Sequence, residues 1–185
     1  RLQNNNWIRR TGLQFHWHNN NYKTFDDFLN ELKSSKRKAI RNERKKIKNT
    51  NLVIEKLTGE QLNDEIWDSF YNFYLNTVDK KWGGAYLTKE FFYLLNDTMK
   101  NDILLIIAKQ DEKVVAGALN FISKNTLYGR NWGSIVNIPF LHFELCYYQA
   151  IEYAIEKQIK TVEAGAQGHH KIQRGYIAKP TYSNH

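Results

Sequence analysis

The sequence predicts a protein of the α/β (α+β) class, with a mixed central sheet that contains an antiparallel meander and is flanked by helices. Three strand-like segments, residues 102–110, 114–123 and 126–133, follow one another with connections of only two or three residues, as in a run of hairpins. Segments with helical periodicity precede and follow this run, and another strand-like segment comes after them. A helix between two strands returns the chain to the same sheet, so we expect a meander joined to a crossover.

The first 51 residues predict a strand and two helices. Residues 12–17 alternate between apolar and polar side chains, as a half-buried strand does, and an Asn-rich turn at residues 19–21 ends the segment. Thr24 followed by Asp27 has the spacing of a helix start, and a basic helix comes next. The apolar face of the first helix is expected to hold Phe25, Phe28, Leu29 and Leu32.

From Leu52 onward, the order of the elements is informative. The predicted strands outside the meander are residues 52–57, 161–166 and 175–183. The predicted helices cover residues 63–79, a segment after Thr88 and a long segment after Pro139. The side chains spaced for burial in the first two helices are Ile66, Trp67, Phe70, Phe73, Tyr74, Phe91, Phe92, Leu94 and Leu95.

The composition fits one globular domain of ordinary size with a few added elements. Of the 185 residues, 42% are hydrophobic, and five Trp, eleven Tyr and ten Phe can form a packed core. The longest apolar run, residues 103–108, is too short for a membrane span, so we expect a soluble protein. The single cysteine, Cys146, excludes an internal disulfide and fits a reducing compartment, so we expect the cytoplasm. Because the chain starts at Arg1 rather than Met, we expect a fragment.

The positive charge is concentrated in one predicted helix. Residues 34–48 hold eight basic residues and one Glu, a net charge of +7, while the whole chain carries +8. Ile40 and Ile47 mark a thin apolar stripe that could dock on the domain. The cations that helical spacing places on one face are Arg37, Arg41, Arg44 and Lys48.

This basic face has two interpretations. It could be a solvated surface that only aids solubility, or it could capture the phosphates of a nucleic acid or of a pyrophosphate-bearing substrate. The sequence has no zinc-ligand spacing, no heptad array behind the basic run and no RNP-like strand motif. We therefore do not expect a protein that reads DNA.

Several stretches together resemble the peptidoglycan biosynthesis/recognition branch of FemAB-like proteins, within the GNAT acyltransferase superfamily. The stretches are SSKRKAIRNERKKI, KKWGGAYLTKEFF, VVAGALNF, TLYGRNWG, HFELCYYQAIEYAIE and VEAGAQGHHKIQRGYIAKPTYSNH. The long AGAQG-H-x-K-x-x-RGY block is the most specific of them. The resemblance implies a GNAT-like acyl-CoA N-acyltransferase fold in which a polar loop, residues 167–174, replaces the usual fourth helix.

The resemblance also implies a domain organisation and a reaction. FemAB-like proteins are similar to transferases built from two GNAT-like halves. Residues 1–51 would then be the joining strand and basic helix of a preceding half of the same polypeptide, and residues 52–185 would form a second GNAT-like domain. Better-characterised relatives move an aminoacyl group from tRNA to the amine of a peptidoglycan precursor, which would explain a local basic helix.

One departure from the superfamily pattern bears on the donor. GNAT proteins that use acetyl-CoA bind its pyrophosphate with an R/Q-x-x-G-x-G/A loop at a helix N-terminus, where free N–H groups meet the anion. The corresponding segment here, residues 133–144, has no such glycine pattern. Between the two possible donors, acyl-CoA and aminoacyl-tRNA, the sequence favours the aminoacyl-tRNA.

A dense polar block follows the strand at residues 161–166, at a position where α/β proteins often place a site. Acyl transfer to an amine needs a base and donors for the developing oxyanion, and we assign the catalytic roles to Glu163 and His169. A polar surface loop with a glycine hinge, at Gly165 and Gly168, is the structural alternative. Adjacent histidines diverge, so no metal is expected. The other members of the block, expected to bind substrate, are Gln167, His170, Lys171 and Arg174.

Two further groups are candidates for substrate binding. Tyr128, Arg130 and Trp132 alternate along their strand, so we expect them on one face, where they would bind substrate or form a core face. His142 and Glu144 near the start of the crossover helix are a second base candidate, although a Glu there also favours the helix dipole.

Two other features have mainly structural interpretations. Cys146 lies within an aromatic-rich helix and is expected to be a core residue, because transfer to an amine requires no covalent nucleophile. Trp82, Gly83 and Gly84 predict a loop that either lies over the site or only joins two helices.

The sequence leaves three functions open. The first is a FemAB-like acyl- or aminoacyl-transferase that acts on an amine, with a small molecule or cell-wall precursor as substrate and tRNA as a possible partner. The second is a non-catalytic recognition module that binds a cell-wall precursor or RNA through the basic helix. The third is an acyl-CoA-dependent N-acetyltransferase.

Overall fold

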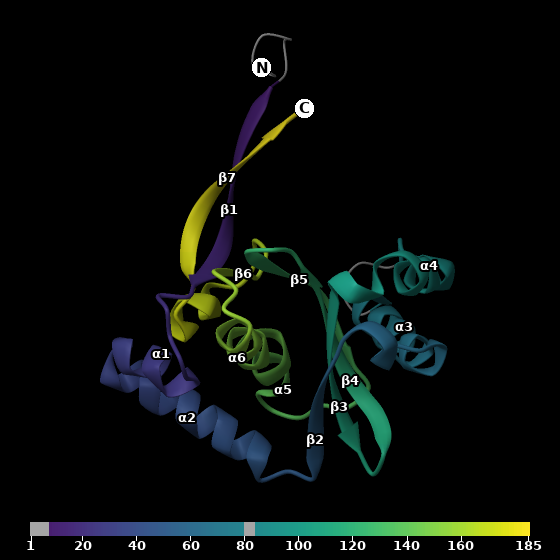
Figure 1. Ribbon diagram of the computed structural model, residues 1–185, viewed down its shortest axis with the longest axis horizontal. Coiled ribbons are helices and arrows are strands. Elements are labelled where there is room, and N and C mark those ends of the chain that lie inside the picture. Colours follow the sequence, from purple (N-terminus) through teal and green to yellow (C-terminus); the bar gives the residue numbers. More distant parts are fainter. Residues whose placement is uncertain (1–7, 80–83) are drawn as a thin grey trace.

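The computed structural model describes residues 8–79 and 84–185, which form one seven-stranded mixed sheet with helices on both faces (Figure 1). Trp82 and Gly83 of the predicted loop lie outside these residues. The strands are β1 (Arg9–His18), β2 (Leu52–Leu57), β3 (Ile103–Gln110), β4 (Lys113–Ile122), β5 (Thr126–Ser134), β6 (Thr161–Glu163) and β7 (Ile177–Asn184). The longer helices are α1 (Phe25–Glu31), α2 (Ser34–Lys48), α3 (Asp64–Asp79), α4 (Lys89–Met99) and α6 (Gln149–Glu156).

The sheet has the strand order β2-β3-β4-β5-β6-β1-β7. Strands β2 to β5 are antiparallel neighbours, and β5 then pairs in parallel with β6 after the helical crossover. This arrangement confirms the predicted fold class, a GNAT-like mixed sheet with an antiparallel meander.

Two apolar cores lie on opposite faces of the sheet. Helices α3 and α4 pack on one face, where Trp67, Phe70 and Phe92 are fully buried. On the other face, α6, α1 and α2 cover a second core that includes Ile40. The prediction that Leu94 faces inward is wrong, because its side chain is 59% exposed. Leu94 is two positions after the buried Phe92, which is about 200° around a helix.

The helix predicted after Pro139 is present but irregular. It begins as α5 (Leu141–Phe143), passes through the π-helical turn η4 (Glu144–Tyr148) and ends as α6. A π-helical turn is wider than an α-helical one and interrupts the regular spacing of side chains. The predicted polar loop also has structure, since it contains the 3₁₀ helix η5 (His169–Arg174).

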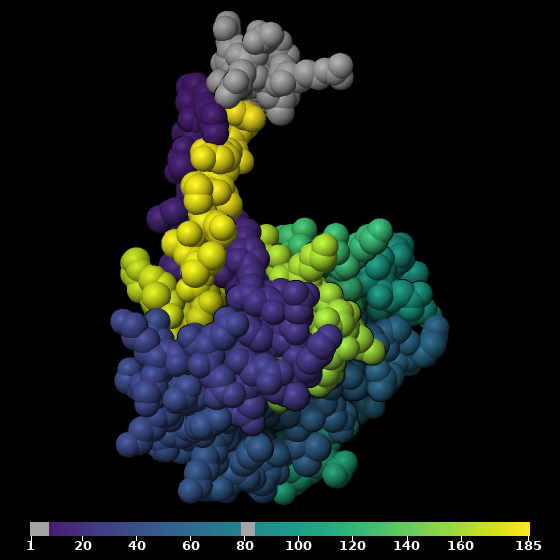
Figure 2. Space-filling model, turned by 60° about the vertical axis from the view of Figure 1, so that its left-hand side comes forward, coloured from purple at the N-terminus to yellow at the C-terminus, as the bar shows by residue number. Residues whose placement is uncertain are grey.

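Strands β1 and β7 form a long ribbon that extends away from the body of the molecule (Figure 1, Figure 2). Near the body, β1 also pairs with β6, so it lies in the same sheet as the other strands. The division of the chain at residue 51 remains a prediction. Among the described residues, no helix combines the length and the apolar character needed to cross a membrane.

Candidate functional site

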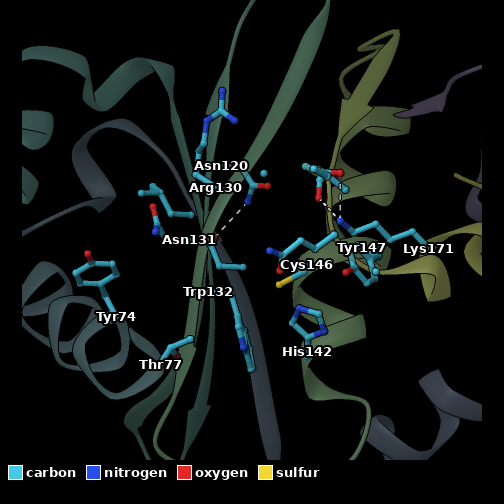
Figure 3. A pocket seen from close by; sticks show the side chains of 18 of the residues that line it. Tyr74, Thr77, Asn120, Arg130, Asn131, Trp132, His142, Cys146, Tyr147 and Lys171 are labelled. Atoms are coloured by element: carbon cyan, nitrogen blue, oxygen red, sulfur yellow. Dashed lines mark hydrogen bonds between the residues drawn. The ribbon is translucent and has the colours of Figure 1, made fainter. Parts of the chain in front are cut away.

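The candidate site lies where strands β5 and β6 separate. The two strands pair through Thr126, Leu127 and Tyr128, and the pairing ends at Tyr128 and Glu163. Beyond this point, Gly129–Trp132 of β5 and Ala164–Gly168 after β6 line opposite sides of a cavity of about 540 Å³ (Figure 3). This volume is within the range of ligand sites, which is about 300–1,000 Å³.

The cavity is lined from both layers of helices. Tyr74 and Thr77 of α3 contribute from one face of the sheet, and His142, Cys146 and Tyr147 contribute from the other (Figure 3). The opening between the strands therefore gives access to both faces. Cys146 was predicted to be a core residue, and it is half-buried at the edge of the cavity.

A β-bulge in β5 corrects the expectation that Tyr128, Arg130 and Trp132 share a face. Tyr128 pairs with Phe121 and Trp132 with Ala118, and the register shifts between these pairs. Directly opposed residues of an antiparallel pair point to the same face. Phe121 packs against the α3 core and Ala118 belongs to the α6 core. Tyr128 and Trp132 thus lie on opposite faces, because the bulge adds one residue to β5.

Of these three side chains, Arg130 and Trp132 line the cavity and Tyr128 does not. The bulge brings in a polar residue that the sequence analysis missed, Asn120 of β4. Its side chain is 1% exposed, and its amide donates to the carbonyl oxygens of Ala118 and Leu104. Asn120 lies opposite Gly129 and lines the cavity. An isolated Asn within a strand of apolar residues gives no pattern that identifies it in advance.

The opposite wall is a turn that depends on two glycines. Gly165 and Gly168 have φ angles of +73° and +98°, which side chains with a Cβ rarely adopt. A Cβ at Gly168 would also lie 2.4 Å from the His170 ring. Gly165 and Gly168 thus bring the following residues, His170 and Lys171, back to the cavity.

Lys171 places a buried amine at the cavity. The residue is 4% exposed, and its Nζ donates to the carbonyl oxygens of Ala164 and Gly165, with 3.3 Å to the second. Burial lowers the pKa of the Lys171 amine. Because an ammonium group has three N–H donors, two such bonds leave one donor for a ligand.

His170 is the second ionisable group in this wall. Its Nε2 lies 3.0 Å from the Tyr147 hydroxyl, and its ring packs near Phe143 and His142. Burial, followed by the charges of Arg174 and Lys171, lowers the pKa of His170 from its ordinary value of 6.5. The neutral imidazole is therefore the main form at pH 7.

Arg174, predicted to bind substrate, points away from the cavity toward α2. Its Nη2 donates to both carboxylate oxygens of Glu43 at 2.8 and 2.9 Å, and its Nη1 donates to the His170 carbonyl oxygen at 2.8 Å. The guanidinium also lies over the Phe143 ring, and Glu43 accepts a further hydrogen bond from Tyr148. Arg174 thus holds the turn that carries His170 instead of lining the cavity.

Glu144 and Arg44 are likewise committed to each other. The Glu144 side chain is 4% exposed, and it pairs with Arg44 at 2.9 Å and accepts from Gln149. Arg44 also pairs with Glu152 at 3.0 Å. The π-helical turn directs Glu144 toward α2, so the structure corrects the expectation that it binds substrate. Arg44 was predicted to lie on the exposed basic face of the helix. Its ion pairs with Glu144 and Glu152 place it instead on the inner face of α2.

The two residues predicted to be catalytic do not line the cavity. Glu163 lies beside His16 of β1, with 3.8 Å between Oε2 and Nε2, on the face of β6 opposite the buried Val162. The His169 ring packs edge-on against Phe15. Their catalytic roles remain predictions. The predicted substrate-binding residues that do line the cavity are Arg130, Trp132, His142, Gln167, His170 and Lys171.

Metal chemistry has no evident site in the described part of the chain. Across residues 8–79 and 84–185, no three His, Cys, Asp or Glu side chains are grouped so that they could hold a metal ion. The polar groups at the cavity include two imidazoles, an amine, a guanidinium, a thiol, phenols and amides, which suit hydrogen bonding and proton transfer.

Solved structures share this fold at low sequence identity. L-PGS from Bacillus licheniformis aligns with a TM-score of 0.70 and 8% identity, over 100% of this chain and 63% of its own. The C-terminal domain of a putative lysylphosphatidylglycerol synthetase from Agrobacterium fabrum gives 0.68 and 12%, over 98% and 62%. FemX gives 0.65 and 12%, over 90% and 59%. The chain spans about three fifths of each, and these identities show the fold alone.

A search of curated proteins found no match. A protein-family model described as FemAB-like, peptidoglycan biosynthesis/recognition, matches residues 1–185. Since this match covers the whole chain, the protein belongs to the FemAB-like family.

Proposed function

We propose that the protein is an acyltransferase that moves an aminoacyl group to the amine of a cell-wall precursor, in the cavity between β5 and β6. The observation that carries the proposal is the presence of His170 and Lys171 in one wall of that cavity. A base and a hydrogen-bond donor are the two groups that acyl transfer to an amine requires.

Each group has a defined role in the proposed reaction. The acceptor amine attacks the carbonyl carbon of the aminoacyl ester, a C–N bond forms, and negative charge develops on the carbonyl oxygen. Lys171 donates its remaining N–H to that oxygen. His170 takes the proton from the amine, and a tautomer that donates Nε2–H to Tyr147 leaves Nδ1 free to accept it. The ester C–O bond then breaks, and the leaving oxygen receives the proton.

The start of the crossover helix favours an aminoacyl ester over acyl-CoA as the donor. Phe140, at the N-cap of α5, has a φ of 70°, and the Leu141 N–H donates to the Ile138 carbonyl oxygen. A bulky residue thus stands where a pyrophosphate site needs glycine and free N–H groups. The name lysylphosphatidylglycerol synthetase, carried by one structural relative, describes aminoacyl transfer and supports the same class of reaction.

A comparison of donors tests the proposal. The protein is incubated with amine-bearing peptidoglycan precursors and either radiolabelled aminoacyl-tRNA or radiolabelled acetyl-CoA. We expect label in the precursor from the aminoacyl-tRNA alone. Transfer from acetyl-CoA alone would replace the proposed donor, and precursor binding without transfer from any donor would indicate a recognition module.

A further inference from the structure

The charges that line the cavity are all positive. Among the side chains that the structure describes, the lining contains Arg130 and Lys171 but no Asp or Glu. A free alkyl amine is an ammonium ion at pH 7, since the pKa of a lysine-type amine is about 10.4. Such a cavity repels a lone ammonium ion, because no carboxylate offsets its charge. An acceptor that carries its own negative charge beside the amine fits this lining better.

The β-bulge of β5 brings one of these cations to the cavity. In the bulge, Arg130 and Asn131 lie opposite the single residue Leu119 of β4. A bulge redirects side chains and is frequent beside active sites. Both bulge residues line the cavity, on the side opposite the turn that leads to Lys171 (Figure 3). The cavity therefore has a cation on each of its two sides.

Arg130 differs from the other arginines outside the β1–β7 ribbon in having no hydrogen-bond acceptor. Those arginines donate to a carboxylate or to a backbone carbonyl oxygen, and they are Arg37, Arg41, Arg44 and Arg174. Within the described part of the chain, the exposed guanidinium of Arg130 contacts only the Tyr128 ring, whose centroid lies 5.5 Å away. Its N–H donors are therefore free to bind a ligand.

A carboxylate next to the acceptor amine satisfies both observations. The planar guanidinium of arginine binds a carboxylate through two parallel hydrogen bonds. An amine that shares its carbon with a carboxylate is a zwitterion with no net charge, so two cations at the cavity do not exclude it. The transferred carbonyl group meets Lys171 in the proposed reaction, which leaves Arg130 for the acceptor.

We propose that Arg130 binds a carboxylate on the carbon that bears the acceptor amine, so that the cavity selects amino-acid-type amines over simple alkyl amines. This inference rests on the proposed transfer to an amine. In a peptide, a diamino dicarboxylic acid has such a centre at the end of its side chain, whereas lysine has the amine alone. The inferred acceptor class is therefore a peptide that contains a diamino dicarboxylic acid.

Equilibrium binding of three peptides tests this subsite in the absence of any donor. The labelled tripeptides differ only in the last residue, which is 2,6-diaminopimelate, the same residue with its side-chain carboxylate amidated, or lysine. In fluorescence anisotropy, the wild type should bind the first peptide about 10- to 100-fold more tightly than the other two, as expected for hydrogen bonds to a charged group. Arg130→Gln should lose this preference. Arg130→Lys should keep part of it, because lysine retains the charge without the two-pronged geometry.

A matched control removes an arginine from another surface. Arg10→Gln changes an exposed residue of the ribbon that does not line the cavity, and its peptide preference should equal that of the wild type. The melting temperature of Arg130→Gln should stay within about 2 °C of the wild type, because Arg130 is exposed. An equal loss of preference in both variants would overturn the proposal. An Arg130→Gln variant that keeps the preference, or a wild type that binds all three peptides equally, would do the same.

The subsite and the transfer reaction can fail separately, because the binding experiment contains no donor. If the wild type prefers the diaminopimelate peptide but no donor yields transfer, the carboxylate subsite is supported and the proposed reaction fails. If the wild type transfers an aminoacyl group but binds the diaminopimelate and lysine peptides equally, the subsite alone is refuted.

Discussion

Two regions of one short 3₁₀ helix have opposite roles. At the cavity, Lys171 keeps one N–H donor for a ligand and His170 has a lowered pKa. A single turn later, Arg174 is bound to Glu43, to the His170 carbonyl oxygen and to the Phe143 ring. The first region can bind and react, whereas the second region fixes its position. Polar residues close in sequence therefore need not share a function.

The difference between these two regions predicts that the largest effect of a substitution is on the transfer rate, at the cavity. His170→Gln should lower the rate of aminoacyl transfer by about 10²–10⁴-fold, because the variant has no base at that position. Its melting temperature should change little, since the His170 side chain is exposed. The measurement is the steady-state rate with labelled donor.

Two controls sharpen this test. Glu163→Gln and His169→Gln change residues outside the cavity lining, and each should keep the rate within about threefold of the wild type. A large loss in either variant with a normal rate for His170→Gln would restore the roles predicted from sequence.

The next effect concerns stability in the second region. Arg174→Met should destabilise the fold by about 3 kcal/mol, because it leaves the partly buried Glu43 carboxylate without its cation. For a chain of this size, that loss corresponds to a fall of about 6–12 °C in melting temperature. The control Lys89→Met breaks the exposed pair with Asp68 and should cost less than about 1 kcal/mol. Similar losses in both variants would refute a structural role specific to Arg174.

The smallest effect is a pH dependence of stability. Since the pKa of His170 is lowered in the folded state, the unfolded state takes up its proton first as the pH falls below 6.5. The contribution of His170 to the free energy of unfolding is therefore present above pH 6.5 and is lost as the pH falls below this value. His170→Gln should show a smaller fall between pH 7 and pH 5 in urea unfolding. Burial also lowers the pKa of His18, so part of the change of unfolding free energy with pH should remain in the variant. If the variant and the wild type lost the same free energy between pH 7 and pH 5, the role assigned to His170 would be contradicted.

Much of the fold could be predicted because hydrophobic periodicity reports burial directly. The order of the elements along the chain from Leu52 and the buried side chains of α3 follow from that periodicity, and Leu94 is the exception in α4. The bulge in β5 could not be predicted from the strand itself. One extra residue between Gly129 and Trp132 changes the face of every side chain beyond it, and only the pairing with β4 reveals it.

Only part of the candidate site could be predicted from the sequence. The polar block after β6 does reach a cavity, through His170 and Lys171. Whether a charged side chain is free depends on partners that are distant in sequence. Glu43 and Arg174 are 131 residues apart, and Arg44 and Glu144 are 100 residues apart. No local pattern in the sequence indicates these pairs.

The replacement Lys171→Met tests the central assignment most directly. Methionine has a similar shape without the ammonium, and the loss of the hydrogen bonds to the Ala164 and Gly165 carbonyl oxygens should cost about 1–3 kcal/mol of stability, which a melting curve of the variant measures. We predict that the rate of aminoacyl transfer falls by about 10²–10³-fold, the usual loss for an oxyanion donor. A variant that folds normally and transfers at the wild-type rate would contradict the assignment of this cavity as the active site.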